Sequence, residues 1–375
     1  MKKSLIALAA LGTIASSAMA QSSVTIYGII DLGLVKQNRA DPDAERSLGG
    51  VGQTNNQVNV AQGTKSRLGF KGVEDLGGGL SAKFELEHRF LPDTGAINTS
   101  GANQFWDKSI VGITSQTFGE VTLGRDYGPT FYAQYLLDPW LNQGIAEVGG
   151  TTYAFAGYSL GNHQVRYNNA IFYKAQVGGF TGFASAQLSE ASGVKNRYGI
   201  GAMYTAGPLF VTGAYDQAPS PVNGQKDDLF LIGAAYDFGM IKPRISYARS
   251  SLMTPFGGKV NPTALTLAAT VPVGTDLIKL GYTHLDWKTG GPYAQAAAAG
   301  TAAAAIAAGD FATAGAAAAA GTAAANGETF KQTKLSIGYE HVLSKRTALY
   351  TDLTNGKTRG FQSVTGFDVG IRHAF

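Results

Sequence analysis

The sequence predicts an all-β protein, a sixteen-stranded antiparallel transmembrane β-barrel with an inward-folded third loop. Segments that alternate apolar and polar residues recur along the chain, and the connections between them are alternately short and long. One long connection, 128–162, is unusually aromatic. Alternation with a period of two is typical of a strand with one apolar face. Short turns on one side and long loops on the other are typical of barrels in outer membranes.

The N-terminus predicts export. Lys2 and Lys3 precede an apolar run from Leu5 to Ile14, and small residues lead up to Ala20. These are the parts of a secretory signal peptide, so we expect cleavage after residue 20 and a barrel over 21–375. The apolar run is shorter than the roughly 20 residues that a membrane helix needs.

Composition excludes two classes of protein. The chain has no cysteine, which removes the disulfide scaffolds common among exported proteins. It has 30 basic and 26 acidic side chains, two of the basic ones in the predicted signal peptide. The mature chain is therefore nearly neutral, and nucleic-acid binding has no support in its composition.

Sixteen strands are predicted, an even number as a bacterial barrel requires. They cover 23–35, 66–76, 80–90, 107–116, 120–127, 163–175, 180–190, 197–207, 208–218, 227–238, 240–251, 263–273, 275–287, 329–343, 347–356 and 364–375. In the hairpin 66–90, Phe70 and Phe84 share one face while Lys71 and Glu85 share the other. A single hairpin of this kind also fits a soluble sandwich. The sorting of the connections by length favours the barrel, which leaves no open strand edge in lipid.

One segment does not follow the strand pattern. Residues 294–325 are almost all Ala, Gly and Thr, with Asp310 in the middle. A membrane helix here would break the even strand count, and Asp310 would lie in the hydrocarbon. We therefore predict that 288–328 is a long low-complexity extracellular loop.

The sequence carries no signature of an enzyme, a cofactor or a metal. GGVGQT at 49–54 lacks the strand and helix that flank a nucleotide-binding loop. Residues 41–46 begin like a calcium loop, but Arg46 stands where the turn glycine belongs. The five histidines are scattered with no pair at metal spacing.

The expected functional feature is a lumen, because sixteen strands leave an aqueous channel. Basic residues predicted to face it come from neighbouring strands and form one wall of a pore constriction: Arg67, Lys71, Arg89, Lys108 and Arg166. If the long connection folds inward, it places Asp126, Asp138 and Glu147 opposite this wall. Facing charges of opposite sign make a transverse field that sorts polar from apolar solutes.

Several motifs together carry a family resemblance. They are SVTIYGIIDLGL (23–34), SRLGFKGVEDLGGGLSAKFELE (66–87), GEVTLGRDYGP (119–129), VRYNNAIFY (165–173) and IRHAF (371–375). With these, the chain resembles the Gram-negative general porins of the β-proteobacterial and neisserial type. The resemblance implies a homotrimer in the outer membrane and a third loop that constricts each pore. It also implies constriction roles for Arg67 and Arg166, and an assembly signal at Phe375.

The function expected from these features is passive diffusion of small hydrophilic solutes and ions through a water-filled channel. Outer-membrane lipid and lipopolysaccharide are the expected surroundings. The sign of ion selectivity is left open, with anions as one option. Two alternatives remain: a channel specific for a sugar or an organic acid, and an adhesin or structural barrel that acts through its extracellular loops.

Overall fold

The computed structural model describes residues 23–38, 56–98, 105–149, 165–190, 194–220, 225–253, 259–288, 329–358 and 363–375. The predicted signal peptide (1–20) and the Ala-rich segment 294–325 lie outside these ranges. Signal peptide and extracellular loop both stay predictions.

Sixteen long strands and two short ones form a single antiparallel sheet. The long strands are β1 (Ser23–Gln37), β3 (Arg67–Gly77), β4 (Leu80–Arg89), β5 (Lys108–Ser115), β6 (Gly119–Tyr127), β7 (Arg166–Val177), β8 (Phe180–Gln187), β9 (Arg197–Ala206), β10 (Leu209–Pro219), β11 (Lys226–Tyr236), β12 (Lys242–Met253), β14 (Thr263–Val273), β15 (Asp276–Lys288), β16 (Thr329–Val342), β17 (Thr347–Thr358) and β18 (Val364–Ala374). The short strands β2 (Val58–Ala61) and β13 (Lys259–Val260) pair with β1 and β12. Neither short strand was predicted.

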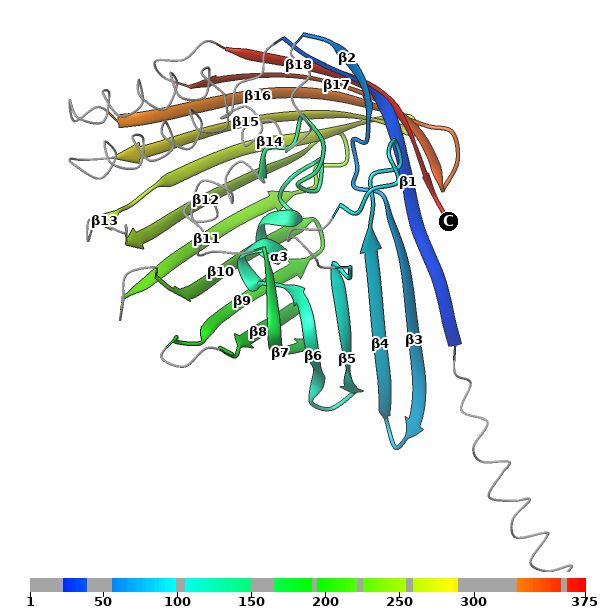
Figure 1. Ribbon diagram of the computed structural model, residues 1–375, viewed down its shortest axis with the longest axis vertical. Helices are drawn as coiled ribbons and strands as arrows, with labels where there is room; N and C mark the ends of the chain where they lie inside the picture. The colour runs from blue at the N-terminus through cyan, green and yellow to red at the C-terminus, as the bar shows by residue number, and fades with distance from the viewer. Residues whose placement is uncertain are drawn as a thin grey trace, which may run out of the picture.

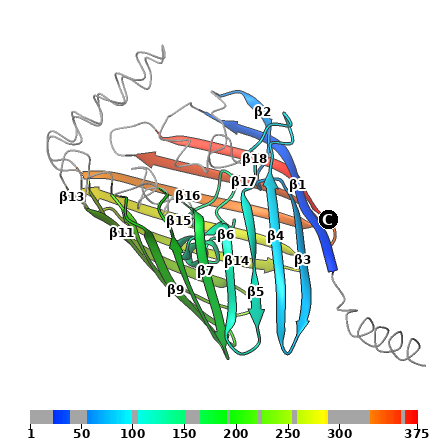
Figure 2. The ribbon, with the colours of Figure 1, turned by 60° about the horizontal axis from the view of Figure 1, so that its bottom comes forward.

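The sheet closes into a barrel at β1. This strand pairs with β3 on one side and with β18 on the other, in a register that runs from Ile29↔Ala374 to Gln37↔Gly366. Figures 1 and 2 both show the last strands, β17 and β18, beside β1. The predicted sixteen-stranded barrel is confirmed. The predicted strand 163–175 begins three residues too early, and most other ends are closer.

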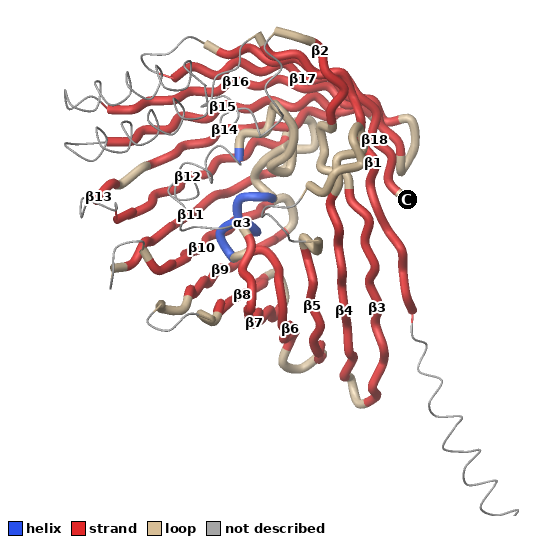
Figure 3. The backbone as a smooth tube through the Cα atoms, in the orientation of Figure 1, coloured by secondary structure: helices blue, strands red, loops and turns tan. Residues whose placement is uncertain are grey.

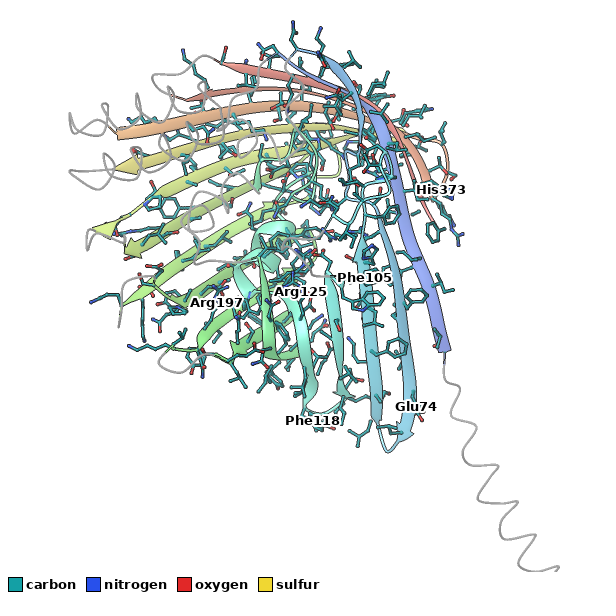
Figure 4. All side chains as sticks on the ribbon, viewed as in Figure 1. Glu74, Phe105, Phe118, Arg125, Arg197 and His373 are labelled. Atoms are coloured by element: carbon teal, nitrogen blue, oxygen red, sulfur yellow. The ribbon has the colours of Figure 1, made fainter. Side chains whose placement is uncertain are left out.

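The alternation of connection lengths is also confirmed. Short connections lie at 78–79, 116–118, 178–179, 207–208, 237–241, 274–275 and 343–346. Glycines with positive φ close three of the tightest of them: Gly78 (62°), Gly207 (54°) and Gly274 (64°). Residues without a Cβ adopt this conformation at little cost. Figure 4 shows Phe118 and Glu74 at this short-turn end of the strands.

Exposed and buried faces alternate as a membrane barrel requires. On β16, Leu335 and Ile337 are 63% and 48% exposed on the outer face, whereas Lys334 and Ser336, which alternate with them, are buried. The same pattern recurs around the barrel, with apolar side chains outside and polar side chains inside. This arrangement leaves the lipid in contact with hydrocarbon and the interior in contact with polar groups. No helix of the described residues is long and apolar enough to cross a membrane.

The long connection after β6 contains a helix that the sequence analysis did not predict. Helix α3 (Pro129–Tyr135), blue in Figure 3, begins with proline, which is favourable because the first helical residue needs no intrahelical N–H bond. Its buried residue Ala133, with Leu137 beyond its end, packs against β10–β12. The wall residues in this cluster are Ala214, Leu229, Leu231 and Ala248.

Strand β11 is apolar on both faces because α3 packs on it. Phe230 and Ile232 are exposed on the outside, while Leu229 and Leu231 are buried on the inside. Two leucine side chains would not be stabilised on a lumen wall that faces water. Burying each leucine stabilises the packing of α3 by about 1.5–3 kcal/mol.

Residues 138–149 fold around one carboxylate. Asp138 accepts hydrogen bonds from the backbone N–H groups of Trp140, Asn142, Val148 and Gly149, at 2.9–3.1 Å. Asp138 is itself only 1% exposed. Four backbone donors of an irregular segment are thereby satisfied within the segment itself.

Polar contacts tie this segment to the inner face of β15–β17. The Trp140 indole N–H donates to Asp352 Oδ1 at 2.7 Å, and Lys334 Nζ donates to the Glu147 carbonyl at 2.5 Å. Thr283 Oγ1 donates to the Val148 carbonyl at 3.0 Å. Residues 129–149 are thus in contact with the inner face on two sides, apolar at β10–β12 and polar at β15–β17.

The barrel seam includes the last residue of the chain. Gly28 N–H donates to the Phe375 carbonyl and Phe375 N–H donates to the Gly28 carbonyl, each at 3.1 Å. The Phe375 ring lies over Gly28 so closely that a Cβ at position 28 would collide with it. Glycine at position 28 is therefore part of the seat for the terminal ring.

Deleting Phe375, or replacing Gly28 by Val, should lower the yield of closed barrel, because each change removes contacts of the β1–β18 seam. Gel mobility without heating, at which a closed barrel migrates differently from the unfolded chain, measures this yield. Phe118→Ala, which removes an exposed ring from a turn far from the seam, is the matched control and should fold normally. Normal yields for both seam variants would contradict the role of this contact.

Candidate functional site

A cavity of about 480 Å³ is lined by β1, by strands of the β3–β6 wall, by the last two residues of the chain and by α3. Strand side chains of this wall line one part of it, among them Arg67, Glu87 and Lys108. Aromatic side chains of α3 line another part, among them Phe131 and Tyr135. The cavity therefore brings the predicted basic wall and the aromatic connection together.

Arg89 and Arg166 meet at a carboxylate that the sequence analysis did not single out. Asp107 Oδ2 lies 2.7 Å from Arg89 Nε and also forms an ion pair with Arg166. Asp107 is 1% exposed and each arginine is 6% exposed. Arg89 also pairs with Glu87 at 3.1 Å. A buried charge without a partner costs several kcal/mol, so these pairs stabilise the cluster by neutralising it.

Tyr127 joins the arginines to the aromatic helix. Its hydroxyl accepts hydrogen bonds from Arg89 (2.5 Å) and Arg166 (2.7 Å). The Arg166 guanidinium lies 4.3 Å from the Tyr127 ring centroid, a cation–π distance. Phe131 stacks on the same ring, with centroids 4.4 Å apart and planes at 15°. The position of α3 is thereby coupled to the position of the arginines.

Asp126 does not lie where the sequence analysis placed it. It belongs to strand β6 rather than to the loop, and it forms an ion pair with Lys108 of the neighbouring strand at 3.2 Å. Lys108 also pairs with Glu85 at 2.8 Å. Asp126 is therefore on the basic wall and not opposite it, because it lies within the strand predicted at 120–127 and not in the connection that follows.

Asp138 does not face the basic wall across a gap either, because its carboxylate accepts hydrogen bonds from its own segment, as described above. Glu147 is 3% exposed, and its carbonyl accepts a hydrogen bond from Lys334 on the far side of the barrel. Its negative charge acts on Lys65. The predicted opposition to the basic wall is thus wrong for Asp126 and Asp138, and for Glu147 it stays a prediction. Irregular backbone requires acceptors for its own N–H groups, and Asp138 supplies them.

Two of the predicted basic residues differ from the rest of the wall. Arg67 lines the cavity, and its closest carboxylate is Glu87, 3.8 Å from Nε, beyond hydrogen-bond distance. Lys71 is exposed, lies 5.3 Å from the Tyr27 ring centroid and is not part of the cavity lining. Arg67 is therefore placed to act on a solute in the cavity, whereas Lys71 lies apart from it.

Lys65 is a basic residue of this site that lies outside the predicted strands. Its backbone N–H donates to Gln143 Oε1 at 2.7 Å, which places the residue against the inner segment. Burial, together with the neighbouring Arg89 and Arg166, lowers the pKa of Lys65 to about 8. Lys65 is thus a titratable positive charge of the cluster in the neutral to mildly alkaline range.

The charges of the site nearly balance. The cavity lining holds three basic side chains, Arg67, Arg89 and Lys108, and two carboxylates, Glu85 and Glu87. Around the lining, Lys65 and Arg166 are matched by Asp107, Asp126 and Glu147. The lining itself therefore carries one positive charge in excess, and Arg67 is its most loosely paired base.

Little in the sequence indicated the residues that were missed. Asp107 directly precedes Lys108, so strict alternation with an inward Lys108 would have directed Asp107 outward. It is buried because it lies before the first residue of β5, where the alternation does not apply. Lys65 lies in a segment without periodicity, and nothing local indicates its position. No group of three or more His, Cys, Asp or Glu side chains in the described ranges is arranged to hold a metal ion.

Comparison with known proteins agrees with this architecture. Residues 7–360 match the family model described as Gram-negative porin. The chain is 34% identical to outer membrane porin protein 32 of Delftia acidovorans and 31% identical to an outer membrane porin protein of Bordetella pertussis. Each of these matches covers 100% of both chains.

A solved structure resembles the barrel closely. The anion-selective porin from Comamonas acidovorans aligns with a TM-score of 0.70 and 28% identity, over 95% of this chain and 100% of that one. The family match spans most of the chain, and the alternation of short turns and long connections is the one expected of such barrels. This chain belongs to the Gram-negative porin family.

Proposed function

We propose that this porin lies in the outer membrane and forms a water-filled channel for passive diffusion of small hydrophilic solutes and ions, with a preference for anions. The observation that carries the proposal is the cavity beside α3, whose lining holds three basic side chains (Arg67, Arg89 and Lys108) against two carboxylates (Glu85 and Glu87). Lipopolysaccharide and outer-membrane lipid surround the apolar outer face in this proposal.

The constriction of the channel is the cavity beside α3. Arg67, Arg89, Lys108 and Arg166 supply its basic wall, and residues 129–149 narrow the lumen from the inside. Lys65 adds a further positive charge from the loop before β3. Charges in such a confined space act with little screening by water, so a small excess is sufficient to bias the passage of ions.

The preference for anions is supported by a relative as well as by charge. The Comamonas acidovorans protein of similar structure is described as anion-selective. An organic-acid channel, the alternative left open by the sequence, has the same sign of charge and differs only in having a site for its solute. Solute specificity therefore has to be tested separately from ion selectivity.

Replacing Arg67 by Glu should shift the reversal potential in a salt gradient towards cation selectivity. The change replaces a positive charge by a negative one and so lowers the net charge of the cavity by two units. Each unit alters the electrostatic energy of a nearby ion by on the order of 1–2 kcal/mol. Planar-bilayer recording measures the shift. Arg244→Glu is the matched control, because Arg244 is half-buried on β12, seven long strands from β3, which carries Arg67. Equal shifts in the two variants would show that charge acts diffusely and that this wall holds no constriction.

Raising the pH from 7 to 9 should lower the preference for anions. Lys65 has a pKa of about 8, so it loses its proton in this interval and the cluster beside the cavity loses one positive charge. The measurement is the reversal potential as a function of pH in bilayers of neutral lipid. Lys65→Gln should show the low preference at both pH values, and Lys65→Arg the high preference at both. A wild-type preference that is constant between pH 7 and 9 would contradict this assignment.

The working form of the porin in this proposal is a homotrimer. One protein of similar fold, the outer membrane protein OmpT of Vibrio cholerae, has been described in a trimer form, at 12% identity. The outer apolar face also offers the surface that association in lipid needs. Light scattering in mild detergent should give a protein mass, corrected for bound detergent, equal to that of three chains. A protein mass equal to that of one chain would contradict the proposal.

A further inference from the structure

We propose that the cavity beside α3 is a binding site for aromatic carboxylates, with Arg67 and Tyr135 holding the carboxylate and the rings of α3 holding the arene. The proposal deepens the channel function proposed above and rests on it. Four side chains carry the argument: Arg67, Tyr127, Phe131 and Tyr135, all of which line the cavity.

Arg67 and Tyr135 are hydrogen-bond donors with unused capacity. The Arg67 side chain makes no hydrogen bond within the described ranges, and its nearest carboxylate oxygen is 3.8 Å away. The Tyr135 hydroxyl likewise has no hydrogen-bond partner in those ranges, and burial raises the pKa of Tyr135, so it stays a donor at neutral pH. A carboxylate offers two acceptor oxygens and a negative charge, which match one guanidinium and one phenol.

The other charged groups of the cavity are already paired. Glu85 accepts from Lys108 and from the Tyr27 hydroxyl, and Glu87 accepts from Arg89. These carboxylates therefore repel an incoming anion less than unpaired ones would. Their pairing also leaves little for a cationic ligand to bind.

Most of the apolar lining of the cavity is aromatic. Phe131 and Tyr135 are four residues apart on α3, so they lie on the same side of the helix, with ring centroids 6.0 Å apart. Tyr127 stacks on Phe131 at 4.4 Å, and all three rings are half-buried. Two arginines hold the Tyr127 hydroxyl, as described above, so the ring is fixed in place. Ring faces prefer an aromatic ligand to an aliphatic one of equal size.

The size of the cavity is adequate for this ligand. A volume of about 480 Å³ falls in the range of small-molecule sites, roughly 300–1,000 Å³. Benzoate, the smallest aromatic carboxylate, leaves room for water to pass beside it. The site thus fits a ligand that pauses in the channel and moves on.

The test compares three anions as blockers of chloride current through single channels in planar bilayers: benzoate, cyclohexanecarboxylate and acetate. Benzoate should reduce the current saturably, with a half-blocking concentration about threefold to tenfold lower than that of cyclohexanecarboxylate. Acetate, which lacks a ring, should block only at much higher concentration.

Two variants assign the parts of the site. Tyr135→Phe should raise the half-blocking concentration of benzoate and cyclohexanecarboxylate by a similar factor, about fivefold, because both lose one hydrogen bond. Phe131→Leu should remove most of the difference between the two. Tyr215→Phe, which removes a hydroxyl on the outer face of β10, is the control and should change neither value.

The outcomes of these measurements separate the binding site from the channel function. A channel with normal chloride current that is blocked equally by benzoate and cyclohexanecarboxylate, or in which Tyr135→Phe has no effect, overturns the site and leaves the channel function standing. Absence of chloride current in the wild-type protein overturns the proposed function itself. Chloride current in the variants without blocker shows that they fold, so a loss of block cannot be ascribed to misfolding.

Discussion

Backbone hydrogen bonding in hydrocarbon is the constraint on which the rest of this structure depends. A strand in lipid has no water to pair with its N–H and C=O groups, so every long strand needs a neighbour on both sides. The pairing of β1 with β18 meets this need at the one place where the order of the chain does not meet it. The Phe375 ring over Gly28 extends this seam to the last residue.

Closure creates an interior that the chain has to organise. A sheet of sixteen strands encloses more space than its own side chains fill, and residues 129–149 occupy part of it. The inner face accommodates them by changing its character from strand to strand. It is apolar where Leu229 and Leu231 contact α3, and polar where Lys334 and Thr283 contact the carbonyl groups of the segment. The lumen wall therefore holds residues 129–149 in place in addition to lining the channel.

The pairing of charged side chains in the interior reflects the free-energy cost of withdrawing a charge from water. Arg89, Arg166 and Lys108 are largely withdrawn from water, and each has a carboxylate partner on the same wall. Neutralisation by close neighbours is less costly than opposition across an open gap, since desolvation is repaid only at short distance. The positive character of the cavity lining therefore rests on Arg67, whose contact with Glu87 at 3.8 Å is the loosest ion pair of the wall.

Local sequence patterns are sufficient to specify the barrel. Strand periodicity, turn glycines and the length of each connection are local properties, and the closing of a sheet in lipid leaves few ways to combine them. All sixteen strands could be predicted from these properties, as could the inward direction of Arg67, Arg89, Lys108 and Arg166.

The role of the long connection, in contrast, depends on the closed barrel. Its path follows contacts with β10–β12 and β15–β17, which are more than sixty residues away in the chain. No periodicity within 128–162 encodes those contacts, which is why α3 and the internal role of Asp138 were missed. The same holds for Lys65, whose pKa depends on Arg89 and Arg166, brought near it by the fold. Local pattern sets the direction of a strand side chain, whereas the neighbours of an irregular segment are set by the space that the closed barrel leaves.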